Sequence, residues 1–457
     1  MPPLSRRVLL ATSVSYALIL LDTSIANVAL PRIGQALAMP LAGLQWVMSA
    51  YTLAFASLLL TGGALGDRWG ARRVYLAGLL AFTLASLVCG LAPNAALLIA
   101  ARAAQGLGAA LLVPAALKLI QQACPDPAQR ARAIGLWVGI GGVAMAAGPL
   151  AGGALTEWLG WRSIFLLNLP LGLYGAAMAW RIPATPGTRA AVRFDLPGQA
   201  TAILALTGLI GVLIEGQALG WTSAPIVAGA AVALAAGIAF LRIQARSAHA
   251  MLPLTLFSHP LFAASTAVSM VSAFVFYGLF FVASLGFQDQ RHWGPLQAGL
   301  AFLPMTVSVA LASMTSHRIA RACGPILSMC LAFGLYAAGA LGLLAAGSSS
   351  YGYSVPALLA IGLASGFISP AATAPALETV APQRAGVAAA ALNTARQAGA
   401  ALGVAVFGSL LAALPPFAAG ARAALLIAAA LALGAALAWA ALVRSGGNNA
   451  RLLVKSN

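Results

Sequence analysis

The sequence predicts an all-helical, polytopic membrane protein with fourteen transmembrane helices. Three observations support this fold class. Of the 457 residues, 61% are hydrophobic and only 7% are charged, whereas a soluble domain carries about 25% charged residues. The apolar residues fall into long runs, each close to the roughly 20 residues that a helix needs to cross the hydrocarbon core. The positive charges between these runs fall predominantly on one side.

Fourteen apolar runs follow one another along the chain. They are helices rather than strands, because an open sheet edge would leave backbone groups unpaired in lipid and a barrel strand needs only about 9–11 residues. The basic segment Met1–Arg7 precedes a first run without a small-residue cleavage site, so we expect that run to be retained rather than removed as a signal peptide. The runs cover residues 8–30, 43–65, 74–92, 95–120, 133–155, 163–181, 196–215, 222–241, 260–288, 296–316, 324–346, 353–377, 386–413 and 421–443.

The positive charges predict the orientation in the cell membrane, because cytoplasmic loops hold an excess of Lys and Arg. With both termini in the cytoplasm, 19 of the 25 Lys and Arg residues fall inside, and Arg102 and Arg396 fall within spans. The outer side then holds only Arg32, Arg162, Arg291 and Arg422. Merging the two runs that flank residues 216–221 would move eight inside charges outside, so the rule favours two spans there.

Several function classes find no support in the sequence. The net charge of +17 arises from basic residues scattered singly between apolar runs, so no nucleic-acid partner is expected. The four cysteines show no metal-ligand spacing, and His249, His259, His292 and His317 all fall in predicted loops. An enzyme would need a nucleophile with a base, or metal ligands, facing a cavity. We therefore expect neither an enzyme nor a bound cofactor.

The chain resembles itself at an offset of about 250 residues. The matching segments are Leu44-Gln45 with Leu296-Gln297, Arg68 with Arg318, and Pro114-Ala115-Ala116 with Pro370-Ala371-Ala372. Two parallel halves with a substrate site between them are an architecture that transporters use. We expect an N-terminal six-helix bundle at 1–181, a cytoplasmic linker at 182–195, two inserted helices at 196–243 and a C-terminal six-helix bundle at 244–457.

The loop after the second run combines glycines with charges. Glycine allows tight turns, and Asp67 can pair with an arginine or cap a helix start. The loop is either a set of topogenic charges or a latch that forms in one transporter state and breaks in the other. Its G-x-L-x-D-R-x-G pattern resembles the signature loop of the major facilitator superfamily, which implies the latch, although Ala71 stands where that family usually has a basic residue. The latch candidates are Gly63, Asp67, Arg68, Gly70 and Arg72.

Arg102 lies within the fourth run, in the segment R-A-A-Q-G-L-G that also contains Gln105. A charge at the bilayer centre costs about 2.5–3.5 kcal/mol on insertion scales and marks a functional candidate. Arg102 sits about 10 Å below the outer end of the run, so snorkelling to the interface is the alternative. The pattern resembles the superfamily's proton-antiporter motif, which implies that Arg102 assists proton movement.

Asp22 lies in the first run at nearly the same depth, about 12 Å below the outer end. Asp22 and Arg102 can therefore pair, and a carboxyl that balances burial against a nearby cation can load and release a proton. The segment from Leu21 to Pro31, which includes Asn27, resembles the L-D-x-T-x-x-N-x-A-L-P motif of fourteen-span drug–proton antiporters. The resemblance implies that Asp22 carries protons. A purely structural ion pair is the alternative.

The fifth run is rich in glycine. Gly135/Gly139 and Gly148/Gly152 are spaced four apart, which lets helices approach closely. Pro149 removes a helical hydrogen bond and permits a bend. Ordinary helix packing is one explanation of this pattern. Its G-P-x-x-G-G ending, with Gly141 upstream, resembles the superfamily motif that is associated with export rather than uptake.

Further residues are candidates for lining a substrate cavity. Asn393, Arg396 and Gln397 have spacings that can place them near one face of a helix. We group them with Asn27 and Gln105 as cavity candidates, with helix packing as the alternative.

Tyr277 and Phe281 belong to an aromatic cluster that is either a pocket wall or a surface packed against lipid or core. The segment Ile214-Glu215-Gly216 resembles one that recurs in the family. Glu215 falls at the outer rim, where we expect a solvated loop residue rather than a coupling residue.

The resemblance covers nearly the whole chain and is closest to fourteen-span drug–proton antiporters, including those that confer resistance to methylenomycin-like antibiotics. It implies alternating access between two halves, driven by inward proton flow. A proton-coupled importer of a small metabolite on the same fold is the alternative. Asp22 is the only acidic residue deep in a span, whereas Arg102 and Arg396 are cationic, so we expect a neutral or weakly anionic amphipathic substrate. We expect a monomer surrounded by membrane lipid.

Overall fold

A computed structural model describes residues 3–183, 195–247, 249–347, 349–381 and 384–454. Within these ranges, fourteen helical segments are long and apolar enough to cross a membrane. Each overlaps one of the fourteen predicted runs, so the predicted fold class and number of spans are confirmed. Most of the predicted linker at 182–195 lies outside the described residues.

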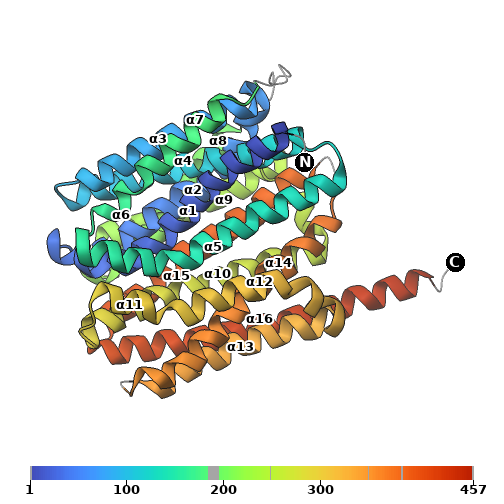
Figure 1. The fold of residues 1–457 in the computed structure, drawn as a ribbon. Helices are drawn as coiled ribbons and strands as arrows, with labels where there is room; N and C mark the ends of the chain where they lie inside the picture. The colour runs from blue at the N-terminus through green and yellow to red at the C-terminus, as the bar shows by residue number, and fades with distance from the viewer. Residues whose placement is uncertain (1–2, 184–194, 248, 348, 382–383, 455–457) are drawn as a thin grey trace. The chain divides into compact units, whose positions relative to one another are not determined.

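The chain divides into two compact units, of which the first comprises Met1–Met251 and Ala283–Leu303. Within this unit α1 packs on α5 and α7, α4 packs on α2 and α3, and the inserted helix α8 packs on α2 and on its partner α9. Figure 1 shows these long helices running side by side. The elements are α1 (Pro3–Ala36), α2 (Leu41–Trp69), α3 (Ala71–Leu91), α4 (Ala95–Ala123), α5 (Pro127–Leu159), α6 (Ser163–Leu166), α7 (Asn168–Trp180), α8 (Leu196–Leu219), α9 (Ala224–Arg246), the π-helical turn η2 (Gly286–Gln290) and α11 (Pro295–Ala301).

The second unit comprises Leu252–Val282 and Pro304–Asn457. A Cβ built at Gly399 or Gly403 of α15 would overlap the backbone of α10 at Met270 and Phe274, so these glycines let two helix backbones approach closely. Helix α13 packs on α14 and α16. The elements are η1 (Leu254–Ser258), most of α10 (Pro260–Leu285), most of α12 (Leu303–Cys323), α13 (Pro325–Ala346), η3 (Tyr351–Ser354), α14 (Val355–Glu378), α15 (Ala385–Ala413) and α16 (Phe417–Val454).

Glycines in the left-handed region end several helices. Gly70 (φ 90°), Gly220 (φ 87°) and Gly324 (φ 77°) follow α2, α8 and α12, because glycine adopts positive φ without a steric penalty. The two predicted spans within 196–241 are confirmed as α8 and α9. Their boundary differs from the prediction, since α8 continues until Gly220 and therefore includes Glu215. For the same reason His317 lies in α12 and not in a loop.

Candidate functional site

Four helices of the first unit place polar side chains in one buried cluster. The cluster consists of Asp22 on α1, Ser86 on α3, Arg102 and Gln105 on α4, and Asn168 at the start of α7. Each of the five is at most 1% exposed. Polar groups buried among apolar helices cost free energy unless they are hydrogen-bonded to one another. We refer to these five residues as the Asp22 cluster.

An ion pair lies at the centre of the Asp22 cluster. Arg102 Nη1 is 2.5 Å from Asp22 Oδ2, and neither side chain is exposed. Arg102 Nε donates to the Val47 carbonyl at 3.1 Å. The guanidinium also lies 4.5 Å from the centroid of the Tyr51 ring, within the range of a cation–π contact. Arg102 therefore does not snorkel in this structure, and the two buried charges compensate each other.

The second carboxylate oxygen of Asp22 is held by two amides. Oδ1 accepts hydrogen bonds from Asn168 Nδ2 at 2.8 Å and from Gln105 Nε2 at 3.2 Å. Ser86 Oγ accepts from the same two nitrogens, at 3.2 Å and 2.7 Å. Gln105 Oε1 in turn accepts from Arg102 Nη1 at 2.8 Å. The Asp22 carboxylate thus receives three N–H donors, one of them charged, which is a strongly held arrangement.

Two members of the Asp22 cluster, Ser86 and Asn168, were not predicted. Asn168 is the only side-chain amide in the apolar run 163–181. An amide in such a run requires a hydrogen-bonding partner within the protein, and this signal could have identified it. Ser86 gives no comparable signal, because a serine can satisfy its hydroxyl on the backbone of its own helix, as Ser86 also does on the Phe82 carbonyl.

The predicted latch residues contact neighbouring helices of the first unit. Asp67, in the last turn of α2, forms an ion pair with Lys118 of α4. Arg72 of α3 donates to the carbonyls of Ala179 at 3.3 Å and Trp180 at 2.5 Å, and a cation at this C-terminus of α7 is favourable for the helix dipole. These contacts join α2 to α4 and α3 to α7. The other members, Gly63, Arg68 and Gly70, lie in α2 or at its end.

The predicted antiporter glycines form a close contact between α5 and α1. A Cβ built at Gly148 would overlap Ser24 Oγ, and one at Gly152 would lie 2.7 Å from Ile25 Cγ1. A Cβ at Gly141 would overlap the ring of the neighbouring helix's tyrosine, Tyr16. The three glycines are spaced seven and four residues apart, which places them on one face of α5. Only glycine fits along this face at the observed helix separation.

The other glycine pair of α5 behaves differently. Apart from the adjoining residues of α5 itself, no described atom lies within 4 Å of a Cβ built at Gly135 or Gly139. The prediction that Gly135 and Gly139 allow another helix to approach closely is therefore wrong for the part of the chain that the structure describes. Gly139 precedes Gly141 by two positions, about 200° around the helix, so it faces away from α1. Pro149 lies inside α5 on the continuing helix.

Two further candidates of the first unit are Asn27 and Glu215. Asn27 is fully buried, and its Nδ2 donates to the Thr23 carbonyl at 3.2 Å. Glu215 is half-buried on α8 and accepts a hydrogen bond from Trp46 Nε1 of α2 at 2.7 Å. The expectation of a solvated loop residue at Glu215 was wrong, because α8 extends beyond it and directs it toward α2.

The candidates of the second unit lie on α10 and α15. Asn393, Arg396 and Gln397 are half-buried on α15, and Arg396 Nη1 donates to Ser369 Oγ of α14. On α10, Phe281 is fully buried, whereas Tyr277 is half-buried and meets the Phe276 ring edge-on at 5.3 Å.

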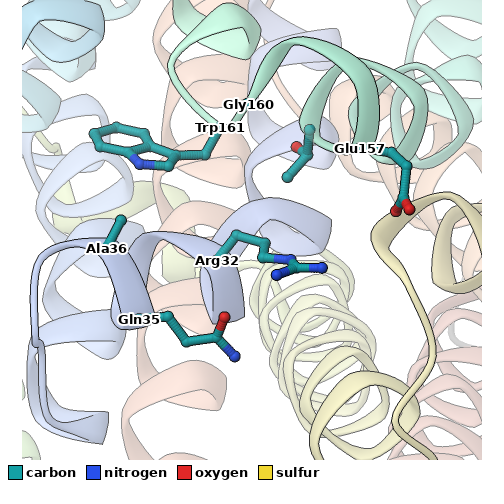
Figure 2. Close-up of a pocket in the computed structure, with 7 residues that line it drawn as sticks. Arg32, Gln35, Ala36, Glu157, Gly160 and Trp161 are labelled. Atoms are coloured by element: carbon teal, nitrogen blue, oxygen red, sulfur yellow. The ribbon is translucent and has the colours of Figure 1, made fainter.

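A surface cleft of about 490 Å³ lies at the ends of α1 and α5 (Figure 2). Figure 2 shows Arg32 and Gln35 of α1 on one side, and Glu157 and Trp161 on the other. None of the predicted site residues lines this cleft. Its lining consists of Arg32, Gln35, Ala36, Thr156, Glu157, Gly160 and Trp161.

Comparison with known proteins identifies the family. The model of the Major Facilitator Superfamily matches residues 12–404. The methylenomycin A resistance protein of Streptomyces coelicolor is 39% identical over 406 residues, which cover 88% of this chain and 84% of that protein. The multidrug resistance protein Stp of Mycobacterium tuberculosis is 36% identical over 412 residues, covering 89% of this chain and 75% of Stp.

A solved structure shares the fold. The crystal structure of an auto-inhibited POT family peptide transporter has a TM-score of 0.69 at 15% identity, covering 96% of this chain and 97% of that one. The resemblance carried by the loop, arginine and glycine motifs is confirmed. The chain belongs to the Major Facilitator Superfamily.

Proposed function

We propose that the protein exports small amphipathic molecules, such as drugs or antibiotics, in exchange for protons. Membership of the superfamily makes it a transporter rather than an enzyme. Relatives named for methylenomycin A resistance and for multidrug resistance support export as the direction of transport. In this proposal two six-helix halves rock about a central site in the cell membrane, with both termini cytoplasmic.

The observation that carries proton coupling is the fully buried pair of Asp22 and Arg102. Protonation of Asp22 would leave the Arg102 charge without compensation, and such a buried charge is strongly unfavourable. The two protonation states therefore favour different conformations, which is the requirement for coupling. The driving force suffices, because the membrane potential supplies about 2.3 kcal/mol per charge per 100 mV and each pH unit adds about 1.4 kcal/mol.

The charges of the described residues support a neutral or weakly anionic substrate. The Asp22 carboxylate is compensated by Arg102 and offers little attraction to a dication. Arg396 adds a half-buried cation that donates a hydrogen bond to the uncharged Ser369 side chain. We propose in addition that the contacts of Asp67 and Arg72 form the latch that opens and closes during transport.

Proton release from everted membrane vesicles tests the proposal. Vesicles containing the full chain are acidified inside, and a panel of neutral, anionic and dicationic compounds, with methylenomycin A among them, is added while a dye reports internal pH. A transported compound should release protons. Asp22→Asn should abolish this release, and so should Asp22→Asn/Arg102→Met, in which neither buried charge is left unpaired.

The matched control is Thr83→Val, which removes a buried hydroxyl from α3 that bonds only within its own helix at the Leu79 carbonyl. Full proton release by Asp22→Asn would refute the role of Asp22. Release by dications alone would refute the substrate class, and proton-coupled movement of substrate out of these vesicles would indicate an importer.

A further inference from the structure

The sixth span, Ser163–Trp180, lacks a backbone hydrogen bond beside the Asp22 cluster. It consists of α6, which ends at Leu166, and α7, which begins at Asn168, and Leu167 between them keeps helical φ and ψ of −57° and −30°. Pro170 lies in the first turn of α7 and has no N–H, so it cannot donate the helical hydrogen bond to the Leu166 carbonyl. Asn168 therefore stands at a break in the helical hydrogen-bond ladder, where a small change in the backbone breaks few hydrogen bonds.

Asn168 is the only member of the Asp22 cluster that comes from the sixth span. Its Nδ2 contacts Asp22 Oδ1 at 2.8 Å, closer than Gln105 Nε2 at 3.2 Å. Arg102 and Gln105 both belong to α4. The hydrogen bond of Asn168 thus links the Asp22 carboxylate to α7.

Protonation of Asp22 conflicts with this hydrogen bond. A proton delivered by a hydronium ion to Oδ1 forms an O–H bond, neutralises the carboxylate and leaves a water molecule behind. The new O–H is a donor, and it would face the N–H donor of Asn168. A side-chain amide carries both a donor and an acceptor, so rotation of the Asn168 amide replaces its Nδ2 with Oδ1 and restores a hydrogen bond.

Gln105 cannot make the same exchange without a loss. Its Oε1 already accepts from Arg102 Nη1 at 2.8 Å and from Cys89 Sγ at 3.4 Å. Rotation of the Gln105 amide would place its NH₂ group against the guanidinium, donor against donor. Arg102 thus fixes the orientation of the Gln105 amide, whereas it makes no such hydrogen bond to the Asn168 amide.

We propose that Asn168 is a positioning residue that switches with the protonation state of Asp22: it donates to the carboxylate and accepts from the carboxylic acid. The switch transmits proton loading to α7 at the break in the hydrogen-bond ladder of the sixth span. This inference rests on the proposed proton-coupled function. The charged and titratable groups around Asp22 are Arg102 of α4, Cys89 of α3 and Tyr51 of α2. Asn168 does not titrate itself.

Infrared titration of the purified full chain tests the switch. The carbonyl band of protonated Asp22 is the band that disappears in Asp22→Asn. Asn168→Leu keeps the side-chain size but removes both donor and acceptor. In this variant both protonation states of Asp22 lose a hydrogen bond, so the readout is the side-chain amide carbonyl band of Asn168 in the unmodified protein. This band should move to lower wavenumber when Asp22 takes up its proton, because Asn168 Oδ1 then accepts a hydrogen bond. The shift should be absent from Asn168→Leu and from Asp22→Asn.

Two further variants separate switching from packing. Asn168→Gln retains an amide and should restore a proton-linked shift of the amide carbonyl band. Thr83→Val alters the same α3–α7 interface, where Thr83 packs against Gly172, and should leave the shift of the Asn168 band unchanged. Asn168→Ala replaces Asn168→Leu if the latter is not monodisperse.

The outcomes distinguish this inference from the proposed function. An Asn168 amide carbonyl band that does not move when Asp22 is protonated would refute the switch even if Asp22→Asn abolishes coupling. Coupled transport by Asp22→Asn would refute the proposed function, whatever the Asn168 variants show.

Discussion

Replacing Gly148 with alanine tests the packing of α5 on α1. The added Cβ would overlap Ser24 Oγ and would lie 2.8 Å from Ser24 Cβ, distances that require one helix to move. Overpacking of this kind costs about 1–3 kcal/mol. Alanine is a better helix former than glycine by about 1 kcal/mol, which offsets part of the cost. The net expectation for Gly148→Ala is a loss of stability of about 0–2 kcal/mol.

Gly139→Ala is the matched control on the same helix. Apart from the adjoining residues of α5 itself, no described atom lies within 4 Å of its added Cβ, so only the helix preference acts, and stability should be unchanged or rise by up to about 1 kcal/mol. The helix term is common to both substitutions and cancels in their difference. Gly148→Ala should therefore be less stable than Gly139→Ala by about 1–3 kcal/mol.

Denaturant titration in mixed micelles measures both variants under one condition. Adding Ser24→Gly to Gly148→Ala removes the overlapping Oγ and Cβ, and should recover most of the loss. Equal stability of Gly148→Ala and Gly139→Ala would refute the close approach of α5 to α1 at Gly148. Failure of Ser24→Gly to restore stability would show that the clash lies elsewhere.

Two further predictions concern polar contacts of the first unit. Arg102→Met alone leaves the buried Asp22 carboxylate unpaired and should lower the free energy of unfolding by about 3–5 kcal/mol near neutral pH. Combining it with Asp22→Asn should restore most of that free energy. Additive losses in denaturant titration would contradict the pairing. Trp46→Phe and Glu215→Gln should each loosen α8 from α2, with a coupling of about 1 kcal/mol in a double-mutant cycle, and strictly additive effects would argue against that contact.

The number and order of spans could be predicted from hydropathy, because each span needs its own apolar run and the positive charges test the count. The pairing of Asp22 with Arg102 could be anticipated from their equal depths, since a lone buried charge is unfavourable. Depth does not specify which face of a helix meets its neighbour. For this reason Gly139 was grouped with Gly148 although only the latter contacts α1, and Asn168 was missed although it completes the Asp22 cluster.

The residues at which helices end could not be predicted from hydropathy either. The run containing Glu215 was expected to end before Gly216, because residues 216–221 are less apolar than their flanks. The helix in fact continues to the first residue that adopts positive φ, Gly220. Backbone conformation and not hydropathy decided the end, and the extra turn carried Glu215 from the expected loop to a contact with Trp46.

The two interpretations of the Asp22–Arg102 pair differ in what its removal should do. A buried ion pair is seldom the most stable solution, because apolar residues of similar volume often replace it at no cost or with a gain. A purely structural pair would therefore be dispensable, and the double variant Asp22→Asn/Arg102→Met should fold and transport. A proton-carrying pair predicts that the same variant folds but no longer couples substrate to protons. The hydrogen bonds of Asn168 and Ser86 favour the second outcome, because an amide and a hydroxyl can each donate or accept and so can adapt to either protonation state of Asp22.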